Sequence, residues 1–182
     1  MKTDRQFWQS SSSDGWVNPF PALARNEVVS ACRYMPVIDY GCGVGRLASS
    51  FGIDQYRGVD INRDRVQTAR IGNAGYTFDA IDGHRDLRGS DCGSLIVDNV
   101  LIHVPDDEIE DMIETFCLCA RAIVQCEHFG RKRWRRGRYG HQRDKEEYLQ
   151  MFGHYEFQPA GITEVFNERI NANLSVVTWG KK

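Results

Sequence analysis

An aspartate followed by three alternate glycines stands out among the residues that could do chemistry. It lies in the segment Asp39-Tyr-Gly-Cys-Gly-Val-Gly45, directly after an apolar stretch. Glycine reaches positive φ angles and has no Cβ, so such a turn lets the backbone approach a ligand closely. Asp60 ends the next apolar stretch about 20 residues on, where doubly wound sheets place a carboxylate that accepts the hydroxyls of a ribose. These residues predict a site for a ribose-containing ligand.

The spacing of the glycines separates two classes of cofactor. A dinucleotide site reads G-x-G-x-x-G or A, which would require glycine or alanine where this chain has Arg46. The third glycine, Gly45, comes one residue early. Such a turn suits a ligand that has no pyrophosphate to seat on a helix N-terminus. A nicotinamide-dependent oxidoreductase is therefore disfavoured, and a plain glycine-rich turn without a ligand remains the structural alternative.

The elements that must position this turn alternate along the chain. Apolar runs predict strands and helical spacing of apolar residues predicts helices. The predicted strands are 36–40, 56–60, 76–81, 94–98 and 120–126, and the predicted helices are 22–33, 44–51, 62–71 and 105–116. This alternation predicts an α/β fold, a doubly wound and mostly parallel sheet with helices on both faces.

The C-terminal part follows a different pattern. A basic segment, 131–143, precedes a predicted helix at 144–152. Two predicted strands, 157–166 and 174–179, are joined by a short Asn-rich link. This spacing predicts an antiparallel hairpin that closes the sheet.

Composition and length indicate one globular domain. The chain has 182 residues, of which 41% are hydrophobic and 26% charged. We divide the domain 1–182 into an N-terminal segment or lid (1–33), a cofactor-binding core (34–126), and a substrate-side loop, helix and hairpin (127–182). A net charge of −2 excludes a uniformly basic nucleic-acid coat. No apolar run approaches the ~20 residues that span a bilayer, so we expect a soluble, cytoplasmic protein that does not bind membranes.

The six cysteines predict no metal site. They lack the paired Cys-x-x-Cys or Cys/His spacing that zinc requires. We interpret them as reduced core thiols. Cys117 and Cys119 are expected to be neighbours on one face of a strand.

Taken together, residues 25–126 resemble the class I S-adenosylmethionine (SAM)-dependent methyltransferases. The resemblance implies that the glycine turn wraps the methionine part of SAM, and that Asp60 holds the ribose while Ile61 packs on the adenine. It also implies that Ile81-Asp-Gly83 brackets the adenine amino group, which Asp82 accepts. The turn residues that the resemblance implies as cofactor contacts are Asp39, Tyr40, Gly41, Cys42, Gly43 and Gly45, joined by Asp82 and Gly83.

The segment Asp98-Asn-Val-Leu-Ile-His-Val-Pro105 is similar to the end of the fourth strand in the branch that methylates small molecules. The resemblance implies that Asp98, Asn99 and Val100 line the cofactor, with backbone at the first two positions meeting the methionine amino group. It places His103 near the transferred methyl. His103 is therefore our candidate catalytic residue, either as a general base or as a histidine hydrogen-bonded into the wall.

The basic segment holds seven of the 23 Lys and Arg residues of a chain that is acidic overall. It follows the fifth predicted strand, at the sheet edge where doubly wound folds bind ligands. Arginine suits phosphate or carboxylate, because its planar fork makes two parallel hydrogen bonds. We expect a small, anionic methyl acceptor there, with the candidate contacts His128, Arg133, Arg135, Arg136 and Arg143. A solvated surface loop is the alternative.

Other functions remain open from the sequence. A nucleic-acid methyltransferase could use the same basic segment, although the chain lacks the Asn/Asp-Pro-Pro-Tyr/Phe motif for exocyclic amines. A non-catalytic module could keep the cofactor pocket as a scaffold. Two departures from the family are the absence of a Pro-Gly-Gly turn before the fifth strand and of a long insertion over the substrate. Trp8 and Trp16 are either core residues or parts of a lid.

Overall fold

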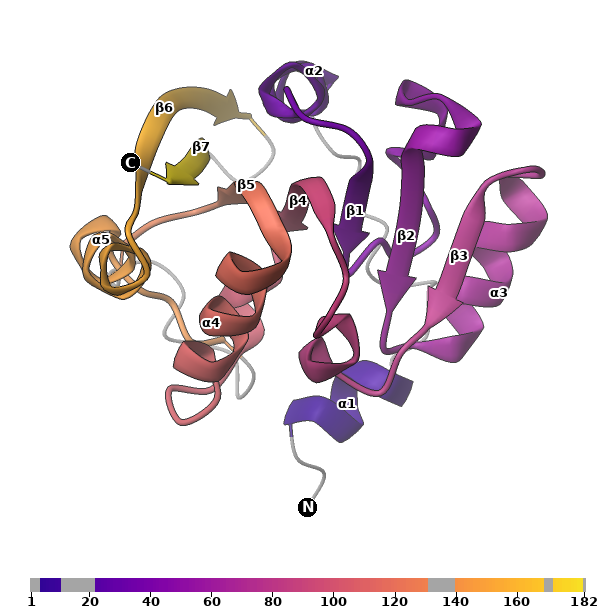
Figure 1. Cartoon of the computed structure of the whole chain (residues 1–182), viewed down its shortest axis with the longest axis horizontal. Helices are drawn as coiled ribbons and strands as arrows, with labels where there is room; N and C mark the ends of the chain where they lie inside the picture. The colour runs from indigo at the N-terminus through magenta and orange to yellow at the C-terminus, as the bar shows by residue number, and fades with distance from the viewer. Residues whose placement is uncertain (1–3, 11–21, 131–139, 169–171, 182) are drawn as a thin grey trace.

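The described residues form a seven-stranded sheet whose order is β3-β2-β1-β4-β5-β7-β6 (Figure 1). The computed structural model describes residues 4–10, 22–130, 140–168 and 172–181. The strands are β1 (Val37–Tyr40), β2 (Tyr56–Asp60), β3 (Thr77–Ala80), β4 (Cys92–Asp98), β5 (Ala120–Glu127), β6 (Phe157–Asn167) and β7 (Ala172–Lys181). The first five pair in parallel, whereas β7 is antiparallel to both β5 and β6. The predicted fold class and closing hairpin are confirmed.

Helices cover both faces of the sheet, and the strand period of two explains how. Val37 packs with α2 (Ala22–Ala31) and α3 (Arg63–Gly72) on one face. Its neighbour Ile38 belongs to the cluster on the other face, with α4 (Ile109–Cys119) and α5 (Lys145–His154). Successive side chains of a strand point to opposite faces, so strands buried on both sides read as continuous apolar runs.

The chain reverses its direction along the sheet at β1. From β1 it proceeds to β2 and β3 on one side, and it then returns to β4 on the other side of β1. The connections that leave the carboxyl ends of β1 and β4 therefore run in opposite directions. Doubly wound sheets bind ligands at such a switch point. The glycine turn follows β1 at this place.

Two predicted elements are wrong. The predicted helix 44–51 is instead a series of turns followed by the short 3-10 helix η2 (Ala48–Ser50), because Gly45 has a φ of +78°, which no right-handed helix can include. Cys117 and Cys119 lie in the last turn of α4 and not on a strand. The apolar spacing of Ile109, Ile113 and Phe116 is helical and extends the helix to this point.

The helix ends agree with their capping residues. Asn62 accepts the backbone N–H groups of Asp64 and Arg65 and begins α3, as predicted. Asp144 and Glu147 form a reciprocal capping box at the start of α5. The helix α4 begins at Ile109 rather than at 105, after a turn. Short elements that the sequence did not predict are α1 (Asp4–Ser10), η3 (Ile53–Gln55), η4 (His84–Leu87) and η5 (Leu101–His103).

None of the helices in the described ranges is both long enough and apolar enough to cross a membrane.

Candidate active site

The glycine turn has the backbone geometry that its sequence predicts. Gly41, Gly43 and Gly45 have φ angles of +77°, +56° and +78°. A Cβ on Gly41 would stand 2.5 Å from Cγ2 of Val100, and one on Gly45 would stand 2.7 Å from Cζ of Phe78. A Cβ on Gly43 meets nothing within 4 Å. The outer two glycines therefore serve packing, whereas Gly43 borders open space that a ligand can fill.

Asp60 links this turn to the next helix. Its Oδ2 accepts the backbone N–H of Gly43 at 2.8 Å, and its Oδ1 accepts that of Asn62 at the same distance. Burial raises the pKa of the Asp60 carboxyl, and these backbone bonds oppose the rise. Asp60 thus lies at the carboxyl end of β2 against the glycine turn.

Two further carboxylates are buried beside the turn. Asp39 is 3% exposed and accepts the hydroxyl of Tyr56 at 2.6 Å. Burial raises its pKa to about 7, and repulsion from Asp98 and Asp60 adds to the rise. Burial likewise raises the pKa of Asp98 to about 6, although the guanidinium of Arg46 at 3.6 Å opposes it. Three acids at adjacent strand ends make this edge favourable for a cationic ligand.

The end of β4 packs directly onto the glycine turn. Asn99 has a φ of +52°, its N–H donates to Cys126 O at 2.9 Å, and its side chain donates to Asp98 Oδ1 at 2.7 Å. Val100 fills the space where a side chain on Gly41 would stand. Tyr40 and Cys42 are buried within the sheet and turn. The predicted residues of the first and fourth strands are therefore brought together.

The expected adenine residues lie at the same edge. The N–H of Ile81 donates to Asp60 O at 3.0 Å, so the segment 81–83 begins beside Asp60. Ile61 is half-buried against the core. The Asp82 side chain is exposed, pairs with Arg63 at 3.3 Å, and is followed by the extended Gly83.

The short helix α1 lies across the carboxyl ends of the strands (Figure 1). The indole of Trp8 lies against the imidazole of His103, with ring centroids 4.1 Å apart and ring planes tilted by 43°. The Trp8 carbonyl accepts Asn62 Nδ2 at 3.0 Å. The N-terminal helix therefore connects His103 with the helix that follows Asp60. Trp16 lies outside the described residues.

The residues expected to contact the methyl acceptor do not all lie at one place. Arg133, Arg135 and Arg136 lie outside the described residues. His128 follows β5, and its Nδ1 lies 2.6 Å from Asn173 O, which leaves Nε2 as the acceptor nitrogen. Arg143 is buried, and its guanidinium donates to backbone carbonyls of 101–104. It therefore supports the loop that carries His103 instead of presenting its charge at the surface.

Glu127, the last residue of β5, is a residue of this edge that the sequence did not predict. It is fully buried, and burial raises its pKa to about 7. Its carboxylate accepts the backbone N–H groups of Leu101 and Ile102. An acid that ends the apolar run 120–126 was the available signal, because strand ends at this edge carry the site.

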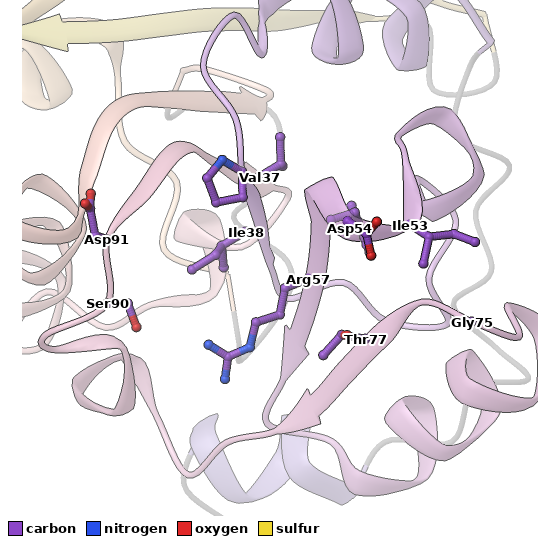
Figure 2. A pocket seen from close by; sticks show the side chains of 11 residues that line it. Val37, Ile38, Ile53, Asp54, Arg57, Gly75, Thr77, Ser90 and Asp91 are labelled. Atoms are coloured by element: carbon purple, nitrogen blue, oxygen red, sulfur yellow. The ribbon is translucent and has the colours of Figure 1, made fainter.

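A cleft of about 490 Å³ lies at the opposite, amino edge of the sheet (Figure 2). The first residues of β1, β2 and β3 line the cleft, and the side chain of Arg57 extends into it from β2 (Figure 2). That guanidinium pairs with Asp79 at 2.7 Å. None of the predicted site residues lines this cleft. Across the ranges that the structure describes, no group of three or more His, Cys, Asp or Glu could hold a metal ion.

No protein-family profile and no curated protein sequence matches the chain significantly. Solved structures do match it. The SAM-bound magnesium protoporphyrin IX methyltransferase of Synechocystis PCC 6803 superposes with a TM-score of 0.75 and 20% identity, over 100% of this chain and 99% of that one. The N-methyltransferase NodS of Bradyrhizobium japonicum, with bound S-adenosylhomocysteine (SAH), gives 0.76 at 12% identity over 94% and 93%. The 1,6-didemethyltoxoflavin-N1-methyltransferase of Burkholderia thailandensis gives 0.68 at 18% identity over 87% and 78%. The chain therefore has the fold of the class I SAM-dependent methyltransferases.

Proposed function

We propose that this protein is a SAM-dependent methyltransferase that acts on a small, anionic acceptor. The observation that carries the proposal is the meeting of the glycine turn, Asp60 and the end of β4 at the switch point of the sheet. Structures with the same fold hold SAM or SAH. A non-catalytic scaffold would not need His103 at this edge, so we favour an enzyme.

The charges of the site suit SAM in particular. SAM carries a sulfonium and an ammonium group, and Asp39, Asp60 and Asp98 supply three buried carboxylates around the turn. In this proposal Asp60 binds the ribose, Ile61 and Asp82 contact the adenine, and the backbone after Asp98 meets the methionine amino group. Buried carboxylates interact strongly with a cation because little water screens them.

Bound SAM supplies a methyl group that is already electrophilic. The residues of this chain then have to align the acceptor with the methyl and exclude water, and such alignment can lower a barrier by ~7–11 kcal/mol. Trp8 and α1 cover the edge and exclude water. A hydroxyl or amine acceptor loses a proton in this reaction, and one imidazole nitrogen of His103 accepts it. The products would be the methylated acceptor and SAH.

The anionic nature of the acceptor is supported by the arginine-rich segment 131–143. Two of the neighbouring proteins are named for small molecules, magnesium protoporphyrin IX and 1,6-didemethyltoxoflavin. We also propose a cytoplasmic location, which is supported by the six free and buried cysteines.

Transfer of a labelled methyl group tests the function. Purified protein is incubated with methyl-labelled SAM and with fractionated metabolites or nucleic acids, and we expect label in an anionic small-molecule fraction. A variant in which Arg133, Arg135 and Arg136 become glutamine should raise the KM of the acceptor and leave SAM binding unchanged. Label in nucleic acid, with a log–log salt slope of about −0.7 to −0.9 per phosphate contact, would instead identify a nucleic-acid methyltransferase.

A further inference from the structure

The short helix η5, which carries His103, is hydrogen-bonded to a buried acid. Glu127 Oε1 accepts the backbone N–H of Leu101 at 2.6 Å and that of Ile102 at 3.2 Å. A 3-10 turn of three residues makes few hydrogen bonds of its own. These external bonds therefore define where the turn lies.

The carbonyl side of the same turn is held by the segment that leads into α5. Arg143 donates from Nη1 to Leu101 O at 3.1 Å and from Nη2 to Val104 O at 2.8 Å. The N–H of His141 donates to Ile102 O at 2.6 Å. Glu127 thus binds the N–H groups of the turn, and Arg143 binds its carbonyl groups. We call these two side chains the clamp.

A second row of buried groups fixes the acid itself. Glu127 Oε2 accepts the hydroxyl of Tyr148 at 3.1 Å and the amide of Gln125, also at 3.1 Å. Gln125 in turn accepts the indole N–H of Trp179 at 2.9 Å. Each carboxylate oxygen has two donors, and Glu127, Tyr148 and Trp179 are fully buried. The acid is therefore rigidly oriented towards the turn.

We infer that Glu127 and Arg143 are positioning residues that fix His103 at the point of methyl transfer. The inference rests on the proposed function, in which His103 faces the acceptor. Buried ionic groups seldom stabilise a fold more than apolar residues of the same size. Here their bonds converge on the three residues that flank or precede His103. A fixed imidazole is what proton transfer requires, because a misplaced base loses most of its effect.

The ionisation of Glu127 sets the strength of the clamp. Burial raises the pKa of Glu127 to about 7, and its four donors oppose the rise. The titratable and charged groups that face it are the Tyr148 hydroxyl and the Arg143 guanidinium, which also acts on Tyr148 and pairs with Asp106. The thiol of Cys126, its neighbour on the strand, packs on the other face of the sheet. A protonated oxygen must donate as well as accept, so the bonds to the turn weaken as the pH falls below about 7.

The test replaces Glu127 by glutamine, which keeps the size and removes the charge. Glu127→Gln should speed hydrogen exchange at the Leu101 and Ile102 amides by at least about tenfold. It should also change the ring resonances and titration of His103 in NMR spectra. In the methyl-transfer assay, kcat should fall while the KM for SAM stays near that of the wild type. In the wild type alone, protection of the two amides should increase from pH 6 to pH 8.

Ser175→Ala is the matched control, because Ser175 is buried opposite Glu127 in the β5–β7 ladder and bonds Glu164 instead of the turn. It should leave all these signals unchanged. Unaltered amide exchange and His103 resonances in Glu127→Gln would overturn the inference. If that variant does not fold, Tyr148→Phe, which removes one bond to the acid, decides by the same two signals. If wild-type protein binds no SAH and transfers no methyl, the proposed function fails, whereas the amide exchange still tests the clamp.

Discussion

The two edges of the sheet differ in whether their carboxylates are buried or exposed. At the carboxyl edge Asp39, Asp60 and Glu127 are buried, with raised pKa values. Asp60 and Glu127 accept backbone N–H groups of the turns beside them, and Asp39 accepts the Tyr56 hydroxyl. At the amino edge Asp54 and Asp91 are exposed beside an open cleft. Burying a carboxylate costs free energy. Among the residues that the structure describes, the buried carboxylates lie at the edge that holds the glycine turn, and buried groups with shifted pKa values tend to gather at functional sites.

The largest expected effect comes from filling the space beside the turn. Gly43→Val should abolish the rise in melting temperature that SAH produces, because its side chain enters the open space next to Asp60. Gly75→Val is the control at the amino edge, since Gly75 also has a positive φ, of +94°. Both variants lose some stability through backbone strain. A full thermal shift in Gly43→Val would show that the turn does not hold the cofactor.

A histidine at each edge gives the next comparison. His103→Ala should lower kcat about 10²-fold and leave SAH affinity unchanged, because a general base acts only on the chemical step. His154, exposed at the end of α5, is the control, and His154→Ala should have wild-type kinetics. Normal turnover by His103→Ala would make His103 a wall residue.

The pH dependence of stability sharpens the contrast between buried and exposed acids. The pKa of Asp39 is about 7 in the folded protein, against an ordinary 3.8, so the folded state holds a proton that the unfolded chain has released. The stability that this bound proton gives to the folded state is therefore lost as the pH rises from about 4 to 7. Asp98 and Glu127, whose pKa values are also raised, add to this loss, so the unfolding free energy should fall by several kcal/mol over this range.

Urea titrations between pH 4 and pH 8 measure this loss. Asp39→Asn should flatten the profile, and it keeps an oxygen that can accept the Tyr56 hydroxyl. Asp91→Asn, at the exposed edge, should leave the profile as it is. A wild-type stability that rises over this range would contradict the raised pKa values of these acids.

Much of the fold, and the gathering of the glycine turn with the ends of β2 and β4, could be predicted, because both depend on local patterns. Apolar runs gave the parallel strands, and Asn62 gave the start of α3. The predicted helix 44–51 failed because positive φ angles at the glycines override apolar spacing. The roles of Glu127 and Arg143 depend on contacts between residues far apart in the chain, here 101–104 with 127 and 143. No local pattern of residues reveals such contacts.

The most direct test of the account is calorimetry of SAH binding to the wild type and to Asp60 variants. We expect the wild type to bind SAH and not NAD. Asp60→Ala should weaken SAH binding at least tenfold, since it removes charge-assisted bonds to the ribose worth ~1.5–3 kcal/mol each, and Asp60→Asn should weaken it less because one acceptor oxygen remains. The exposed Asp54→Ala should bind SAH as the wild type does. A folded Asp60→Ala with unchanged affinity, or a wild type that does not bind SAH, would contradict the assignment of this edge as the cofactor site.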